Sequence, residues 1–172
     1  MIAVEADVSD EWPDSSDWPA LAERTVRAAV SASDFADLVE GAAVFEVSVK
    51  FTSDEEVRLL NGQWRAKDKP TNVLSFPMIE PDLIDTIADA GAGEALLGDI
   101  VLARGVCVRE AAEKGVEIAT HAAHLIVHGT LHLLGYDHET GEEEAEEMEQ
   151  TEREALAAIG IADPYHVTED HS

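Results

Sequence analysis

The chain has 172 residues, of which 45% are hydrophobic, so it can bury a sizeable core and is short enough for one domain. Its 37 acidic residues outnumber its 11 basic ones, and the formal net charge of -26 argues against unaided binding to a polyanion. No apolar run approaches the ~18 residues of a membrane span, and no secretion signal opens the sequence. We therefore expect a cytoplasmic protein without a membrane partner, and the single cysteine excludes an internal disulfide.

Alternation of apolar and polar residues predicts the strands. The clearest case is residues 45–51, where Phe45, Val47, Val49 and Phe51 alternate with polar side chains. Strands are also predicted over residues 1–8, 72–76 and 97–103, and Pro77 closes the segment 72–76.

Helical spacing and capping signals predict the helices. Residues 18–32 have an amphipathic pattern, and Ser53 with Glu56 forms a capping box for a second helix. That helix is expected to bury Val57, Leu60 and Trp64. The acidic segment 78–96 fits no periodic pattern well, so it is expected to be a long loop with at most a partly helical portion. Further helices are expected from about 104 to 114 and over 120–134.

The acidic segment 140–159 predicts a final helix. Ala145, Met148, Leu156 and Ile159 are expected on its inner side, and its many glutamates are expected to form a solvated face. Together the segments predict an α+β fold, with a small sheet of about four strands packed with several helices. Residues 1–161 are expected to form a single domain, and residues 162–172 a disordered tail with two surface histidines.

Three histidines converge around the end of the helix expected over 120–134. His128 and His132 are spaced i and i+4, so both imidazoles lie on one face and can share a cation. Gly135 can adopt a positive φ and end the helix, which would bring His138 back to the same point. Three neutral imidazoles are the ligand set of an open zinc site, in which water takes the fourth position.

The histidines also have alternative assignments. Each one alone is better explained as a packed core histidine, but burying the whole set without an ion would require a separate hydrogen-bond partner for each ring. His121 and His124 continue the stripe of His128 and His132, and either could be a supporting or a core residue. Cys107 lies too far along the chain to be assigned as a fourth ligand, and a small buried apolar role suits it better.

The spacing H-x-x-x-H-x-x-G-x-x-H also occurs in metzincin proteases. Those enzymes have a glutamate directly after the first histidine, where it accepts a proton from water at the zinc. Here that position is Gly129, so a metzincin-like metallopeptidase is the second choice.

The histidine segment, with Ala123-His124-Leu125 ahead of it, resembles the signature of the YbeY family, bacterial single-strand-specific endoribonucleases that act in ribosomal RNA maturation. The resemblance extends in family order through Leu60-Asn61 to Arg65, then residues 68–77 and residues 97–101, and covers most of residues 2–161. It implies a mixed sheet with a zincin-like metal helix, and one Zn²⁺ held by His128, His132 and His138 at one end of a cleft.

The same resemblance implies a zinc-dependent hydrolase of phosphodiester bonds that processes the 3′ end of 16S ribosomal RNA and contributes to ribosome quality control. Such a zinc centre lowers the pKa of water and neutralises a phosphoryl oxygen. The implied partners are single-stranded ribosomal RNA precursors and the small ribosomal subunit. A different class remains open, in which the ion only holds the fold of a non-catalytic ribosome-assembly factor.

Arg65 aligns with an arginine that the family resemblance implies is catalytic, and a guanidinium suits phosphate oxygens. Arg58, Lys67 and Lys69 lie nearby and could contact RNA, although a solvated helical turn explains the same charges. The acidic surface suggests that a basic ribosomal protein recruits the enzyme. Asp137 is expected to orient a ligand or cap the helix, while Asn72, Ser75 and Asp99 could line the cleft or support it.

Overall fold

The structure is a computed structural model that describes residues 1–13, 16–65, 71–91, 93–136 and 141–161, with only the backbone at position 65. Within these ranges the strands are β1 (Ile2–Val8), β2 (Val44–Thr52), β3 (Val73–Pro77) and β4 (Glu94–Ala103). The helices are α1 (Trp18–Ala32), α2 (Asp54–Arg65), α3 (Pro81–Asp89), α4 (Arg104–Lys114), α5 (Ile118–Leu133) and α6 (Glu142–Ala158), with a short 3₁₀ helix, η1 (Ala36–Val39). This α+β architecture confirms the fold class expected from the sequence.

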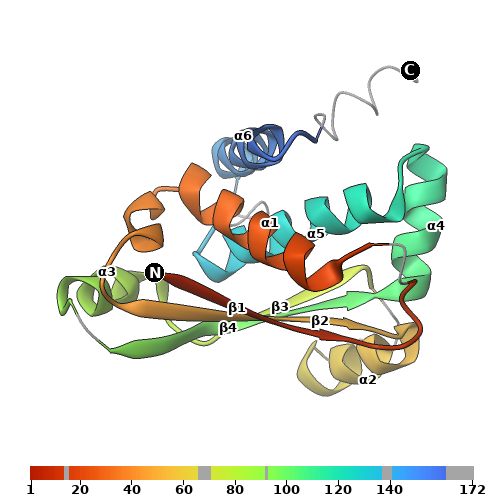
Figure 1. The fold of residues 1–172 in the computed structure, drawn as a ribbon, viewed down its shortest axis with the longest axis horizontal. Coiled ribbons are helices and arrows are strands. Elements are labelled where there is room, and N and C mark those ends of the chain that lie inside the picture. The colour runs from red at the N-terminus through yellow and green to blue at the C-terminus, as the bar shows by residue number, and fades with distance from the viewer. Residues whose placement is uncertain (14–15, 66–70, 92, 137–140, 162–172) are drawn as a thin grey trace.

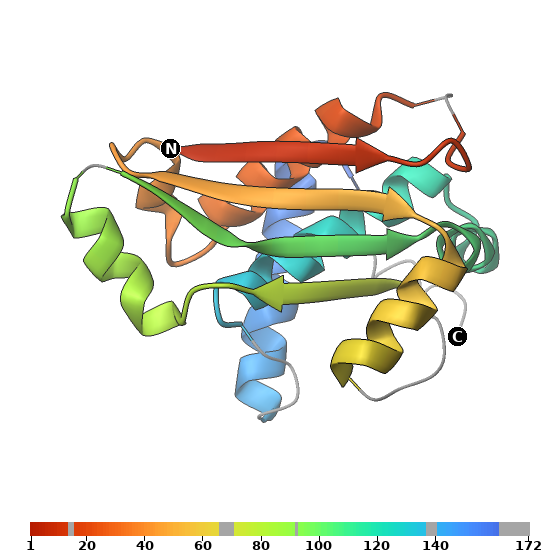
Figure 2. The same ribbon diagram turned by 90° about the horizontal axis from the view of Figure 1, so that it is seen from below.

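The four strands form one mixed sheet in the order β1-β2-β4-β3. The strands β1, β2 and β4 are parallel, and β3 runs antiparallel to β4 at the edge (Figure 2). Val47 pairs with Gly98, and Phe76 pairs with Asp99. This register places the start of the segment 97–101 beside the end of β3.

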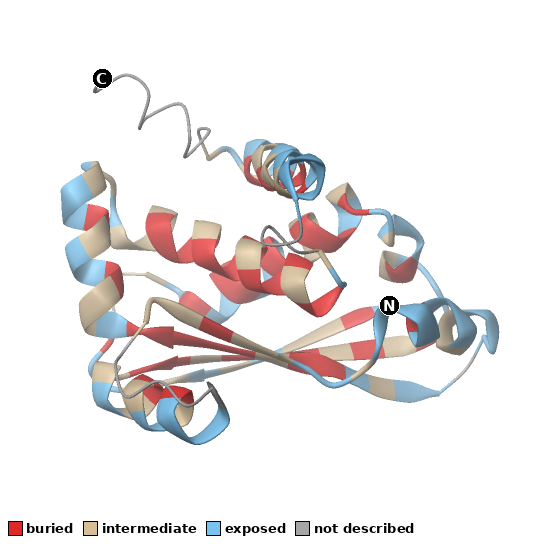
Figure 3. Ribbon diagram, turned by 180° about the vertical axis from the view of Figure 1, so that it is seen from behind, coloured by how far each residue is buried: buried red, intermediate tan, exposed pale blue. Residues whose placement is uncertain are grey.

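The two faces of the sheet have different surroundings. The helices α1 and α5 lie on one face with α6 packed over them, and α2 lies on the other (Figure 1). The alternating apolar side chains of β2 point to the first face, where Phe45, Val47, Val49 and Phe51 are all buried in the main core. The buried sides of α1, α5 and α6 face this layer (Figure 3). One face of the sheet is therefore closed, and the other is covered only in part.

Helix ends follow the signals in the sequence. The Ser53 hydroxyl accepts a hydrogen bond from the Glu56 amide at 3.1 Å, which confirms the capping half of the expected box. The helix α4 ends at Gly115, whose φ of 68° lies in the left-handed region that favours glycine.

Three details correct the sequence expectations. Trp64 was expected to be buried, but it is 66% exposed because it lies near the end of α2, beyond the small cluster that buries Val57. The segment 78–96 contains α3 and the start of β4 and is not mainly a loop. The inner side of α6 includes Glu152, which is fully buried among the otherwise solvated glutamates.

No helix in the described ranges is both long enough and apolar enough to cross a membrane. The expected tail, residues 162–172, lies outside the described residues.

Candidate metal centre

His128 and His132 come together on one face of α5. Their Nε2 atoms are 3.0 Å apart, and the ring centroids are 4.5 Å apart with the rings nearly perpendicular. In a tetrahedral zinc site with Zn–N bonds of about 2.0–2.1 Å, two ligand nitrogens lie roughly 3.3 Å apart. The pair therefore has close to the separation that a shared cation requires.

The other nitrogen of each ring faces an acceptor. His128 Nδ1 lies 2.6 Å from Glu152 Oε1, and His132 Nδ1 lies 2.9 Å from the backbone carbonyl of Tyr136. A carbonyl oxygen only accepts hydrogen bonds, and so does an ionised carboxylate. Each Nδ1 therefore carries the proton, and each ring donates it.

Protonation at Nδ1 leaves the two facing Nε2 atoms without a proton. A neutral imidazole protonated at Nδ1 has a lone pair at Nε2. Two lone pairs that face each other at 3.0 Å repel unless a proton or a metal cation lies between them. Metal-binding histidines commonly donate their second nitrogen to a carboxylate or a backbone carbonyl, and both arrangements occur here. The donor set thus fits a metal ion.

The third expected ligand, His138, lies outside the described residues, and so does Asp137. Within the described part of the chain no group of three or more His, Cys, Asp or Glu side chains is placed to hold a metal ion. Gly135 has a φ of 100°, so the chain leaves α5 through the left-handed turn that the sequence predicts. The three-histidine set therefore remains a prediction, with two of its members brought together.

Glu152 joins a second histidine to the pair. Its Oε2 lies 3.2 Å from His124 Nε2, while its Oε1 contacts His128. Burial acts to raise the pKa of Glu152, but hydrogen bonds from His124 and His128 lower it to about 2. The carboxylate is consequently ionised over the whole physiological range.

His121 belongs to a separate polar cluster at the start of α5. Its Nε2 lies 2.8 Å from Glu110 Oε1, and the same oxygen accepts a 3.0 Å hydrogen bond from Asn72 Nδ2. Asn72 Oδ1 also accepts from the Val73 amide at 2.7 Å. This cluster connects α4, α5 and the start of β3, so Asn72 has a supporting role in the structure.

Gly129 faces the sheet and not the histidine pair. A Cβ atom at this position would lie 3.1 Å from Ile100 Cγ2 on β4, a tight contact. A glutamate there would point towards β4 and would have to displace core side chains. The helix therefore offers no room at this position for the general base of a metzincin.

The expected RNA-contacting residues are only partly described. Arg58 on α2 forms an ion pair with Glu55, with its Nε 3.1 Å from Oε2. Lys67 and Lys69 lie outside the described residues, and so does the side chain of Arg65, whose backbone ends α2. Along the chain, this basic segment connects the end of α2 to the start of β3.

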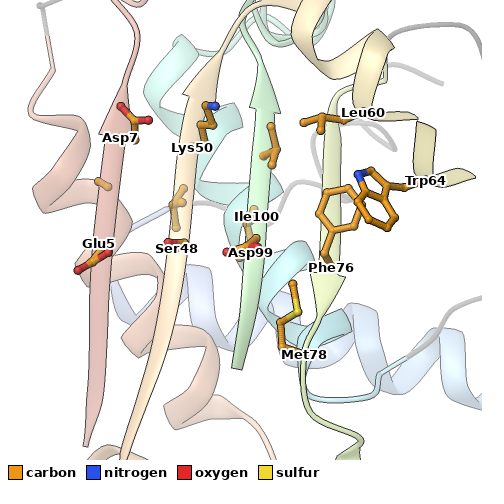
Figure 4. Close-up of a pocket in the computed structure, with 13 residues that line it drawn as sticks. Glu5, Asp7, Ser48, Lys50, Leu60, Trp64, Phe76, Met78, Asp99 and Ile100 are labelled. Carbon is orange, nitrogen blue, oxygen red and sulfur yellow. The ribbon is translucent and has the colours of Figure 1, made fainter. Parts of the chain in front are cut away.

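A cavity of about 560 Å³ lies on the face of the sheet opposite α5. Its described lining has no histidine, so it is separate from the metal centre. Glu5, Asp7 and Asp99 contribute carboxylates, while Trp64 and Phe76 form part of an apolar wall beside β3 (Figure 4). Burial raises the pKa of Asp99. Asp99 thus lines this cavity on the far side of the sheet, and its expected role in the cleft of the metal centre stays a prediction.

Cys107 has the inert role that the sequence indicates. It is completely buried on α4, and burial together with the nearby Glu110 raises the pKa of its thiol to about 12. Such a thiol is neither a ready ligand nor a nucleophile.

Comparisons with known proteins identify the family of the chain. A family model described as Endoribonuclease YbeY matches residues 6–160. The chain belongs to the YbeY family of endoribonucleases. An Endoribonuclease YbeY from Rhizorhabdus wittichii is 58% identical over 99% of this chain and 100% of the relative. The YbeY relative from Sphingopyxis alaskensis is 53% identical over 96% of this chain and 98% of its own length.

A solved structure agrees with the fold. A solution structure of a Thermotoga maritima protein is similar with a TM-score of 0.53 and 24% identity, covering 92% of this chain and 91% of the other. At this level of identity the likeness supports the arrangement of the YbeY-family chain in space and nothing finer.

Sequence reasoning missed three groups around the histidine stripe: Glu110, Glu152 and the Tyr136 carbonyl. Glu152 has a signal in the sequence, because it lies four residues from Met148 and four from Leu156 on the apolar stripe of α6. A glutamate on such a stripe indicates a buried partner for a cation or an imidazole. The Tyr136 carbonyl has no such signal, since any residue type supplies the same atom.

Proposed function

We propose that this chain is a metal-dependent, single-strand-specific endoribonuclease with one Zn²⁺. Family membership supports the nuclease activity, and the observation that carries the metal is the His128–His132 pair. Their Nε2 atoms face each other at 3.0 Å while both Nδ1 atoms donate elsewhere. We propose His138 as the third ligand, supplied from beyond Gly135.

A divalent cation in this position would supply Lewis acidity, which neutralises charge on a phosphoryl oxygen and lowers the pKa of water. The protein's own contribution is to fix the two rings. Glu152 and the Tyr136 carbonyl hold the proton of each ring at Nδ1, so both lone pairs stay available on the same side of α5. The His128 side chain is 26% exposed, so solvent reaches this ring.

We propose that Arg65 binds the scissile phosphate and stabilises its developing negative charge. Arg65 ends α2, directly after the exposed Trp64 and before the segment that carries Lys67 and Lys69. We propose these two lysines and Arg58 as contacts to the RNA backbone. Arg58 would then exchange its surface pair with Glu55 for a phosphate, at little cost because exposed ion pairs are weak.

The proposed substrate is a single-stranded precursor of ribosomal RNA, cut in the cytoplasm during 3′ end processing of 16S RNA and in ribosome quality control. The likeness of the chain to YbeY relatives over almost its full length supports this substrate. A site that holds one cation and one arginine recognises phosphate, not base identity, so recognition of unpaired shape is expected.

The deciding experiment compares wild type, His128→Ala and Arg65→Ala on an unstructured RNA, with metal content measured on the same samples. His128→Ala should lose both metal and cleavage. Arg65→Ala should keep its metal and its circular dichroism spectrum but cleave at least 10²-fold more slowly. Full cleavage by metal-free His128→Ala would refute the metal-dependent nuclease.

The same variants test the two other function classes. For an assembly factor in which the ion only holds the fold, metal removal should unfold the chain, and Arg65→Ala should leave function intact. For a metallopeptidase, the holoprotein should digest casein and His132→Ala should not. The position of Gly129 against Ile100 argues against the peptidase, because no glutamate faces the histidine pair from that site.

We propose a basic ribosomal protein as the docking partner on the small subunit. The cavity on the partly covered face of the sheet is lined by three carboxylates, those of Glu5, Asp7 and Asp99, by one ammonium group, that of Lys50, and by an apolar wall. The excess of acidic groups suits a basic side chain with an aliphatic stem. Asp7→Asn/Asp99→Asn should weaken small-subunit binding and make it less salt-sensitive, while leaving naked-RNA cleavage unchanged. Tight, steeply salt-dependent binding to naked RNA by wild type would contradict recruitment through protein.

A further inference from the structure

We propose that Glu152 is a positioning residue for the metal centre, a carboxylate clamp from α6 that fixes His128 as a ligand through its Nδ1 and is itself fixed by His124. This inference rests on the proposed metal site. It adds that the affinity for the cation depends on a residue of the last helix, 24 positions beyond the ligand in the sequence.

The contacts of Glu152 define the clamp. One carboxylate oxygen is 2.6 Å from His128 Nδ1, and the other is 3.2 Å from His124 Nε2. With both oxygens engaged on neighbouring turns of α5, the carboxylate cannot rotate without breaking a contact. The carboxylate is therefore held at two points, and through its contact with Nδ1 it fixes the orientation of the His128 ring.

The burial of the Glu152 carboxylate determines where it lies. The side chain of Glu152 is 1% exposed, whereas those of His124 and His128 are 12% and 26% exposed. A buried carboxylate is costly unless it is paired and hydrogen-bonded, so its position is dictated by the donors on α5. A negative charge held behind the ligand ring also increases the basicity of the ring towards a cation.

The backbone of α6 holds the clamp in register. Met148 and Leu156, one turn before and one turn after Glu152, are buried in the main core, where α6 packs against α1 and α5. A shift of α6 would therefore move the carboxylate relative to α5. This connects the packing of the C-terminal helix to the orientation of a metal ligand.

A purely structural role is the competing explanation, in which Glu152 only satisfies two buried imidazoles. The two explanations differ in one measurable quantity. A structural residue changes the free energy of unfolding but leaves the metal affinity of the folded protein unchanged. A positioning residue changes that affinity in molecules that remain folded.

The test is titration of stripped wild type, Glu152→Gln and Glu146→Gln with Co²⁺, followed by its visible absorption and by competition with Zn²⁺. Glu152→Gln keeps the shape of the side chain and removes its charge and one acceptor. Glu146→Gln makes the same change at an exposed position of the same helix. We expect the dissociation constant for Co²⁺ to be 10- to 100-fold larger for Glu152→Gln and unchanged for Glu146→Gln.

Two further variants keep the proposal testable if Glu152→Gln does not fold. Glu152→Asp retains the charge on a shorter arm, and His124→Ala removes only the second anchor. Both should weaken Co²⁺ binding by less than Glu152→Gln, in samples whose circular dichroism is native. Wild-type affinity in every folded variant would overturn the clamp while leaving the metal site intact. Failure of wild type to bind Co²⁺ or Zn²⁺ would overturn the metal site as well.

Discussion

The side chain of Leu133 fills the space next to the Cα of Gly98. A Cβ atom at Gly98 would lie 2.5 Å from Leu133 Cδ2 and 2.5 Å from the backbone carbonyl of Phe76. The last turn of α5, which carries His132, therefore rests on β4 at a point where only glycine fits. The L-G-D segment of β4 and the histidine helix are in this way parts of one packing arrangement.

Gly98→Ala should destabilise the protein by about 1–3 kcal/mol, because the Phe76 carbonyl belongs to the sheet and cannot move aside. Urea unfolding followed by circular dichroism measures the change. Gly41→Ala is the matched control, since a Cβ there would meet its nearest atom, the Asp37 carbonyl, at an ordinary 3.4 Å. A Gly98→Ala variant as stable as the control would contradict the close approach.

Cys107 should not react with iodoacetamide in the folded protein at pH 8. Its thiol is buried, and its pKa of about 12 leaves almost no thiolate at that pH. The labelling rate should rise in proportion to the unfolded fraction as urea is added. Rapid labelling in native buffer would show that α4 opens locally or packs differently.

Trp64 and Trp18 should differ sharply in their effect on stability. Trp64→Ala is expected to change the free energy of unfolding by no more than about 0.5 kcal/mol, because the ring is 66% exposed. Trp18→Ala should cost about 3–5 kcal/mol, since its ring is buried, contacts Trp12 edge to face, and donates to the Pro13 carbonyl at 2.6 Å. Equal losses in urea unfolding would show that the end of α2 is packed more closely than described.

Local signals account for most of the fold. The period-2 pattern of residues 45–51 predicts β2, and the bounds of α1 agree with the sequence expectation because Asp17 and Pro19 mark its start. The exposure of Trp64 could not be predicted, since large apolar side chains are usually buried and only the tertiary structure shows where the cover ends. The helix α3 was obscured by its acidic composition.

The sequence predicts that His128 and His132 lie together, but it does not predict the groups that hydrogen-bond to them. The i, i+4 spacing places His128 and His132 together, and Gly135 ends the helix as expected. Their hydrogen-bond partners come from α6 and from the backbone of Tyr136. Such contacts depend on how helices pack, which a spacing rule along one helix does not contain.

The His121–Glu110 pair should make the protein sensitive to acid in two steps. Burial lowers the pKa of His121 below its ordinary value of 6.5, in spite of the opposing hydrogen bond with Glu110. The unfolded chain therefore takes up a proton at this histidine before the folded chain does. Stability that is present above pH 6.5 is lost as the pH falls from 6.5 towards the folded pKa.

Glu110 adds the second step. Burial acts to raise its pKa, but hydrogen bonds from His121 and Asn72 outweigh this and lower the pKa below 4.5. Its contribution is therefore present above pH 4.5 and is lost as the pH falls through the folded pKa. Both groups make the unfolded state bind more protons, so the two losses have the same sign.

Urea midpoints measured from pH 7.5 down to pH 3.5 separate the two groups. His121→Gln, whose amide can still donate to Glu110, should flatten the decline of stability just below pH 6.5. Glu110→Gln should flatten the decline below pH 4.5. Exposed Glu113→Gln on the same helix is the control and should follow wild type throughout. If His121→Gln declines as steeply as wild type below pH 6.5, the buried histidine is not the group that takes up the proton.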